Sequence, residues 1–95
     1  MLVNRRTFVV KRGRLEEAVA LFMAEGERIG ITGRIYVPET GSFDTIAMER
    51  EFESLEEYER LWSEYFASPE AAQFQEKWYD LTETGGTNEI WRLVE

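Results

Sequence analysis

Two signals that begin helices lie close together in the second half of this chain, and they constrain its fold more than any other feature. Ser54 is followed three residues later by Glu57, a capping-box pattern in which each side chain accepts a hydrogen bond from the backbone amide of the other residue. Ser68 and Pro69 repeat the signal, because a proline at the first helical position needs no amide partner. The sequence after Ser54 therefore predicts two consecutive helices.

The second of these helices is predicted to end at Gly85 and Gly86, before a last strand. A further helix is predicted from Leu15, because apolar residues follow at the spacing of one helical face, and Gly26 and Gly30 mark its end. The predicted apolar positions are Leu15, Ala18, Val19, Phe22 and Met23 in the first helix of the chain and Ala71, Phe74, Trp78 and Leu81 in the third.

Strands are predicted where β-branched and aromatic residues gather between glycines or prolines. The segment PETGS, which holds Pro38 and Gly41, suits a short hairpin loop, so the two strands that flank it are predicted to pair antiparallel. The predicted strands are residues 2–11, 31–37, 43–52 and 87–95.

The predicted order of elements is βαββααβ, in a single domain that covers residues 1–95. The pattern L-E-E-x-x-x-L followed by an aromatic residue occurs at residues 15–22 and again at 55–62, each time where a helix follows a strand. Two related βαβ halves would produce this repeated pattern, and so would two acidic helices that match by chance. In either case, two right-handed split βαβ units give an α+β, ferredoxin-like fold, in which helices cover one face of a four-stranded antiparallel sheet.

The predicted sheet carries apolar residues on both faces. In a sheet with one solvent-exposed face, apolar and polar residues should alternate along each strand. In the first strand Phe8 points to one side and Val9 to the other, and in the last strand Ile90 opposes Trp91. Helices cover one face, and the simplest cover for the other is the same sheet of a second chain, packed about a two-fold axis. We therefore expect a homodimer that forms through the sheet face.

The composition excludes several classes of function. The chain has no cysteine and no histidine, so it lacks thiol nucleophiles, zinc–thiolate sites and the commonest catalytic base, and we expect no cofactor and no metal. The net charge of −8 disfavours binding to nucleic acid or to anionic membranes. The first residues lack the apolar stretch of a signal peptide, and no apolar run is long enough to cross a bilayer, so we expect a soluble, cytoplasmic protein.

The order of the predicted helices and strands, and the sequence strings within them, resemble those of a known superfamily. The string GRLEE leads into the first helix, G-x-I-Y-V forms a strand, and FESLEEYERLWSEYFASPEAAQF is followed by KW and a final EIWRLVE strand. In these features nearly the whole chain resembles the dimeric α+β barrel superfamily, and within it the NIPSNAP-like and antibiotic-biosynthesis-monooxygenase-like groups. The resemblance implies that two sheets close a barrel between subunits and that each subunit keeps a cleft between its sheet and its helices.

What the resemblance implies about activity is less specific, because one fold supports many functions. Members include cofactor-independent oxygenases of aromatic polyketides, haem-degrading enzymes, isomerases and proteins without known activity. Haem-degrading members bind iron through histidine, which this chain lacks, so we expect no haem. Cofactor-independent oxygenases have an asparagine and a tryptophan that face the cleft, and the resemblance implies Asn4 and Trp62 for these positions.

Other candidate residues come from the sequence pattern. Tyr58 and Trp62 belong to an apolar stripe along the second helix, which either packs on the sheet or, because Tyr and Trp carry polar tips, borders an aromatic ligand. Arginines occur in all four strands. They either pair with glutamates of neighbouring strands or extend their charged ends to solvent at the rim of the dimer, or one of them, Arg34 beside Tyr36, meets an anionic group of a ligand. The strand arginines are Arg6, Arg34, Arg50 and Arg92, and the candidate ligand-binding residues are Asn4, Arg34, Tyr36, Tyr58 and Trp62.

Two functions are compatible with these observations. One is a homodimeric barrel that binds a small aromatic or apolar organic molecule in the sheet–helix cleft, and the other is a cofactor-independent monooxygenase or isomerase that acts on an aromatic substrate. We favour the first. The space around Trp62 distinguishes packing from binding, because packing fills it with side chains, whereas binding leaves a cavity ringed by Tyr36, Tyr58 and Trp62.

Overall fold

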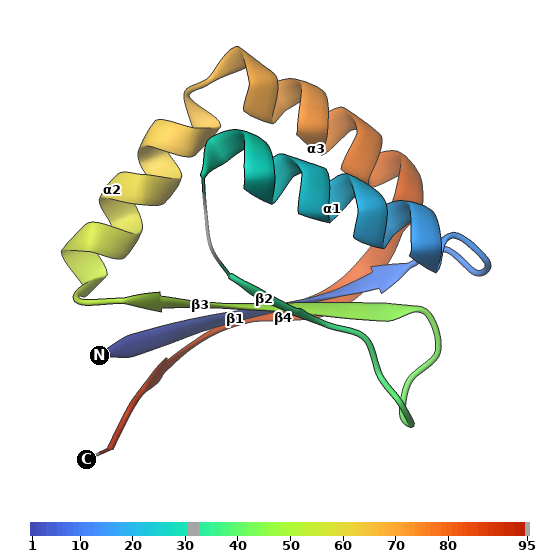
Figure 1. The fold of residues 1–95 in the computed structure, drawn as a ribbon, viewed down its shortest axis with the longest axis horizontal. Helices are drawn as coiled ribbons and strands as arrows, with labels where there is room; N and C mark the ends of the chain where they lie inside the picture. The colour runs from blue at the N-terminus through green and yellow to red at the C-terminus, as the bar shows by residue number, and fades with distance from the viewer. Residues whose placement is uncertain (31–32, 95) are drawn as a thin grey trace.

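The computed structural model describes residues 1–30 and 33–94, and its elements follow the predicted order βαββααβ (Figure 1). The four strands form one antiparallel sheet in the order β2-β3-β1-β4, and all three helices lie on the same side of it. The predicted α+β, ferredoxin-like fold is thereby confirmed. The elements are β1 (Leu2–Val10), α1 (Leu15–Ile29), β2 (Arg34–Tyr36), β3 (Thr45–Phe52), α2 (Leu55–Phe66), α3 (Pro69–Leu81) and β4 (Thr82–Arg92).

The central strand β1 determines which residues face the helices. It pairs antiparallel with β3, where Phe8 lies opposite Ile46, and with β4, where Asn4 lies opposite Ile90. Directly opposed residues of an antiparallel pair share a face of the sheet, and successive residues alternate between faces. Because Ile46 is buried beneath the helices, the even-numbered residues of β1 and β3 face the helices and the odd-numbered ones face away.

The buried core lies between the sheet and the helices α1 and α3. Trp78 of α3 is only 3% exposed, and its ring packs against Phe22 of α1 with centroids 5.1 Å apart and against Phe8 of β1 with centroids 5.2 Å apart. All four apolar positions predicted for the third helix are buried, as expected, whereas α2 contains no buried residue. Complete burial of a large apolar side chain contributes about 1.5–3 kcal/mol, so α1 and α3 hold the domain together more than α2 does.

Both predicted helix starts are confirmed. Ser54 Oγ accepts a hydrogen bond of 3.1 Å from the amide of Glu57, and Ser68 Oγ accepts one of 3.2 Å from the amide of Ala71, just after Pro69. The reciprocal bond of the first cap differs from the prediction. The Glu57 carboxylate accepts from the amide of Glu53, at 2.7 Å, one residue before the cap.

The predicted end of the third helix is wrong. The helix ends at Leu81, and Thr82 begins β4 with its hydroxyl donating to the carbonyl of Trp78 at 2.8 Å. Gly85 and Gly86 lie inside β4, where residues 84–86 occupy the space opposite the single residue Phe8. Such a bulge needs glycine, because Gly86 has a φ of +90° and a Cβ there would lie 2.1 Å from the carbonyl oxygen of Thr7.

Other predicted boundaries shift by a few residues. Gly26 lies within α1, and Gly30 ends the helix in a left-handed conformation, with a φ of 68°. The predicted strand 31–37 is observed as Arg34–Tyr36, while residues 31 and 32, like Glu95 of the last strand, lie outside the described residues. Within the described part of the chain, no helix is long and apolar enough to cross a membrane.

Candidate functional site

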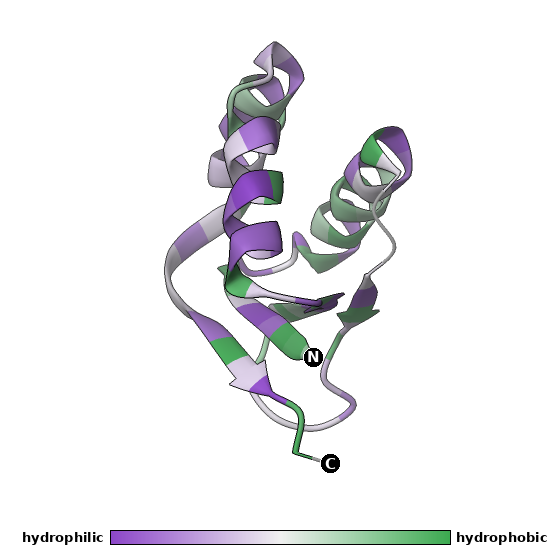
Figure 2. Ribbon diagram, turned by 90° about the vertical axis from the view of Figure 1, so that its left-hand side faces the viewer, coloured by the Kyte–Doolittle hydropathy of each residue, from purple (hydrophilic) through white to green (hydrophobic). Residues whose placement is uncertain are grey.

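A cavity of about 950 Å³ lies between the helices and the sheet. Viewed from the side, α2 and α3 stand on one side of this space and α1 on the other (Figure 2). All three helices, the helix-facing side of β1, β2 and β3, and the first residues of β4 line it. The cavity exists because α2 carries its aromatic side chains to the rim of the sheet without burying any of them completely.

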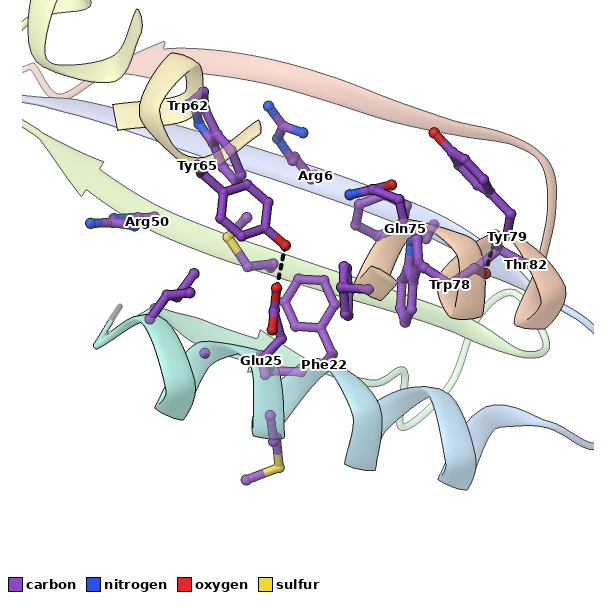
Figure 3. A pocket seen from close by; sticks show the side chains of 18 of the residues that line it. Arg6, Phe22, Glu25, Arg50, Trp62, Tyr65, Gln75, Trp78, Tyr79 and Thr82 are labelled. Carbon is purple, nitrogen blue, oxygen red and sulfur yellow. Dashed lines mark hydrogen bonds between the residues drawn. The ribbon is translucent and has the colours of Figure 1, made fainter. Parts of the chain in front are cut away.

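Eight aromatic residues line the cavity. Phe22 and Trp78 stand at one end, and Trp62 and Tyr65 of α2 stand at the other (Figure 3). Phe66 of α2 also lines the cavity. The rings of Trp62 and Phe66 are stacked, with centroids 5.6 Å apart and planes 25° apart. Walls of this kind suit a planar apolar molecule, which makes offset-stacked or edge-to-face contacts with aromatic rings.

Two arginines of the sheet also line the cavity. Arg6 lies opposite Met48, and Arg50 lies opposite Asn4, so the two arginines are diagonal neighbours on the helix-facing side of β1 and β3. Diagonal neighbours have Cβ atoms about 7–8 Å apart, within reach of one ligand. Ion pairs of the described residues involve other arginines and include neither Arg6 nor Arg50.

Arg6 is held in place by three residues. Its Nε donates to Asn4 Oδ1 at 3.2 Å, its Nη2 donates to the Tyr58 hydroxyl at 3.1 Å, and its guanidinium lies 4.0 Å from the centroid of the Trp62 ring. Asn4 is fully buried and is itself fixed, because its amide donates to Asn88 Oδ1 at 2.8 Å and to the carbonyl of Glu89 at 2.9 Å. The hydrogen bonds to Asn4 and Tyr58 therefore orient the Arg6 side chain before any ligand arrives.

Two buried donors of the described residues lack a hydrogen-bond partner, Arg50 Nη1 and Trp62 Nε1. A buried donor without a partner costs about 1–3 kcal/mol, and more when the group is charged. Burial lowers the pKa of Arg50, against the opposing effect of the Glu57 charge. Both residues line the cavity, although these two atoms are themselves buried.

A second polar cluster joins α1 to α2 across the cavity. The Tyr65 hydroxyl donates to Glu25 Oε2 at 2.5 Å, and Arg28 donates to the same carboxylate at 2.7 and 2.8 Å. The bond from Arg28, more than that from Tyr65, holds the pKa of Glu25 below its ordinary value in spite of burial. Burial, together with the bond to Glu25, raises the pKa of Tyr65. A carboxylate with a lowered pKa is a weak base, so this cluster is better suited to fixing the walls than to proton transfer.

The structure brings three of the five predicted site residues together and separates the other two. Trp62 lines the cavity, while Asn4 and Tyr58 lie behind Arg6 and do not line it. Arg34 and Tyr36 lie on the opposite face of the sheet, where the Tyr36 hydroxyl donates to Glu49 Oε1 at 3.1 Å. The predicted ring of Tyr36, Tyr58 and Trp62 is therefore not formed, because Ile35, not its neighbours, faces the helices.

Arg6 and Arg50 are the site residues that sequence reasoning missed. From the sequence, Arg34 is the arginine expected to meet a ligand, and cross-strand pairs or positions at the dimer rim are the alternative for the strand arginines. The missed signal is the alternation of residues along a strand, in which positions two apart share a face. Arg6 lies two residues before Phe8, and Arg50 lies two residues after Met48, so both arginines lie on the helix-facing side. Among residues 1–30 and 33–94, no group of three acidic, cysteine or histidine side chains is placed to hold a metal ion.

No family model matches the chain, and no curated protein matches it. Several solved structures do. An uncharacterized NIPSNAP domain protein from Burkholderia xenovorans is 16% identical, with a TM-score of 0.85 over 99% of this chain and 95% of that chain. Protein Atu4242 from Agrobacterium tumefaciens is 24% identical, with a TM-score of 0.87 over 99% of this chain and 94% of that one.

The fold is also similar to that of an antibiotic biosynthesis monooxygenase, which is 11% identical, with a TM-score of 0.75 over 100% of both chains. The fold expected from the resemblance to NIPSNAP-like and antibiotic-biosynthesis-monooxygenase-like proteins is thereby confirmed. At such low identity the similarity concerns the fold alone, and the function has to be argued from the site.

Proposed function

We propose that this protein binds a small, largely apolar organic molecule in the cavity between its helices and its sheet. The observation that carries the proposal is the aromatic-walled space of about 950 Å³ left beside Trp62. Ligand sites typically have volumes of about 300–1,000 Å³, mostly apolar walls and a few convergent polar groups. Arg6 and Arg50, which both line the cavity, supply such polar groups.

Packing alone does not account for this space. Protein interiors are close-packed, and side chains that border a void lose their dispersion contacts on that side. A chain of 95 residues has a small core, and it would gain stability if α2 moved onto the sheet and filled the space. Instead, the hydrogen bond from Tyr65 to Glu25 links α2 to α1 across the space.

The proposal is tested with N-phenyl-1-naphthylamine, a neutral aromatic probe whose fluorescence rises in apolar surroundings. We expect saturable binding by the wild-type protein. Phe66→Ala removes a ring from the cavity wall and should weaken binding several-fold, with little effect on folding, because Phe66 is 50% exposed. Phe43→Ala is the matched control, because Phe43 is 77% exposed and does not line the cavity. Absence of saturable binding to the wild-type protein would contradict the proposal.

We further propose that two copies associate through the face of the sheet that the helices leave uncovered (Figure 1). Trp91 is 59% exposed and pairs with Val3 on that face, and Tyr36 and Val9 are placed there by their register. An exposed aromatic residue among apolar neighbours typically marks an interface. Light scattering over a concentration series should give the mass of a dimer, and Trp91→Glu should shift the protein towards monomer. A strictly monomeric wild-type protein at micromolar concentration would exclude this assembly.

A cofactor-independent monooxygenase or isomerase stays a prediction from the sequence alone. The asparagine that the resemblance implies for the cleft is Asn4, and its amide is occupied by Asn88 and the carbonyl of Glu89. No geometric feature of the described site favours chemistry over binding, so we propose binding.

A further inference from the structure

We infer that the ligand of this cavity is an apolar carboxylic acid and that the Arg6 guanidinium binds its carboxylate. The inference rests on the proposed function and specifies the chemical class of the ligand. It identifies Arg6, not the Arg34 expected from the sequence, as the residue that recognises an anion.

The orientation of Arg6 is the first argument. Asn4 and Tyr58 accept hydrogen bonds from Nε and Nη2, and Trp62 covers one face of the guanidinium. Among the described residues, the remaining nitrogen, Nη1, makes no hydrogen bond and is not one of the buried atoms that lack a partner, which is consistent with access from the cavity. A flexible side chain that is already fixed loses little further entropy when a ligand binds, and this favours recognition.

The distribution of charge is the second argument. The chain has 19 acidic and 11 basic side chains, and arginines elsewhere meet acids closely, as in the two bonds of Arg14 to Glu17 at 2.8 and 2.9 Å. Neither Arg6 nor Arg50 has such a partner among the described residues. Two neighbouring cations without a close ion pair in the described part of the chain, of which only Arg50 senses an acid, Glu57, produce a local positive potential in a protein of net negative charge.

Three glutamates also line the cavity, but they do not cancel this potential. Glu25 is neutralised by its two hydrogen bonds from Arg28, and Glu27 and Glu83 are exposed to solvent. A guanidinium fork matches the geometry of a carboxylate, and the aromatic walls accommodate the apolar body attached to it. An apolar carboxylic acid therefore satisfies both parts of the site.

The test compares 2-naphthoate with its neutral methyl ester, by calorimetric titration of the full-length chain. We expect the wild-type protein to bind 2-naphthoate about tenfold or more tightly than the ester, because charge-assisted bonds from arginine are absent for the ester. Arg6→Met should remove this preference, because it should weaken binding of the acid far more than binding of the ester. Arg6→Lys keeps the charge but loses the planar fork, and it should give an intermediate preference.

Arg60→Met is the matched control, because it removes the same charge from an exposed position of α2 that does not line the cavity. It should bind both probes as the wild-type protein does. Equal affinity of the wild-type protein for the acid and the ester would overturn the inference and leave the proposed function intact. Failure of both probes and of N-phenyl-1-naphthylamine to bind would overturn both. A preference that survives Arg6→Met and disappears in Arg50→Met would overturn the assignment to Arg6.

Discussion

The hydroxyl of Tyr65 lies 2.5 Å from Oε2 of Glu25 and joins α2 to α1 across the cavity (Figure 3). Glu25 is kept in place from its own helix by Arg28, which donates two hydrogen bonds to the same carboxylate. The side chain of Glu25 is only 11% exposed, so these bonds act in a largely desolvated setting, where they are stronger than in water. The pair helps to position α2, which has no fully buried residue of its own.

Tyr65→Phe should lower the free energy of unfolding at neutral pH by about 1.5–3 kcal/mol, the usual range for a hydrogen bond to a charged group. Urea unfolding measures this difference. Tyr79→Phe is the control, because Tyr79 also lines the cavity but is 70% exposed, and a change at such a surface should stay within about 0.5 kcal/mol. If the two variants lost the same free energy, the bond between Tyr65 and Glu25 would contribute nothing specific.

The same cluster should make stability depend on pH in the acid range. The pKa of Glu25 in the folded state is lowered, first by the hydrogen bond from Arg28, so the carboxylate contributes stability above its ordinary pKa of 4.5. This contribution is lost as the pH falls through the lowered pKa of the folded state. Between pH 6 and pH 3, the urea midpoint of the wild-type protein should therefore fall more steeply than that of Glu25→Gln. Parallel curves for the two proteins would contradict this assignment.

Local signals in the sequence predicted the elements of the fold but not every boundary. Ser54 and Ser68 begin helices as expected, because a cap is formed by residues that are neighbours in sequence. Gly85 and Gly86 were given the wrong role, since a glycine with positive φ suits a helix end and a strand bulge equally. What decides between them is the pairing of β4 with β1 opposite Phe8, a contact between residues far apart in the sequence.

The candidate site was only partly predictable for the same reason. Arg6 and Arg34 look alike in the sequence, because both are arginines in the middle of apolar strands. The face on which Arg34 lies is set by the pairing of the edge strand β2 with β3, where Arg34 lies opposite Glu49. No local sequence pattern encodes this pairing. For Trp62, helical periodicity predicts the sheet-facing side of α2 and leaves both packing and a place beside the cleft open; in the structure Trp62 lines the cavity.

The bulge in β4 yields a prediction about glycine. Gly86→Ala should reduce the free energy of unfolding by more than about 3 kcal/mol, because it adds a clash with the Thr7 carbonyl to the strain of a positive φ. Gly13→Ala is the control. Gly13 also has a positive φ, of +81°, but a Cβ there would have no neighbour within 4 Å, so we expect a loss of about 1 kcal/mol. Similar losses for both variants, in thermal or urea unfolding, would show that the bulge is more adaptable than the structure indicates.

The two tryptophans Trp62 and Trp78 allow a residue that lines the cavity to be compared with a residue of the buried core. Trp78 is 3% exposed and packed on several sides, so Trp78→Ala should cost about 3–5 kcal/mol and leave little folded protein. Trp62 borders space that is already empty, so Trp62→Ala should cost clearly less and should instead weaken binding of N-phenyl-1-naphthylamine.

Trp62→Phe removes the indole N–H donor but keeps an aromatic ring at this position. Because Trp62 Nε1 is buried without a partner, the phenylalanine variant should lose some apolar contact but regain about 1–3 kcal/mol of desolvation cost, and its stability should stay close to that of the wild-type protein. Urea unfolding of the three variants, with probe titration of those that fold, measures both effects. If Trp62→Ala proved as destabilising as Trp78→Ala, Trp62 would be a packing residue, because removing a side chain from the wall of an unfilled cavity cannot cost as much as opening a new one in the core.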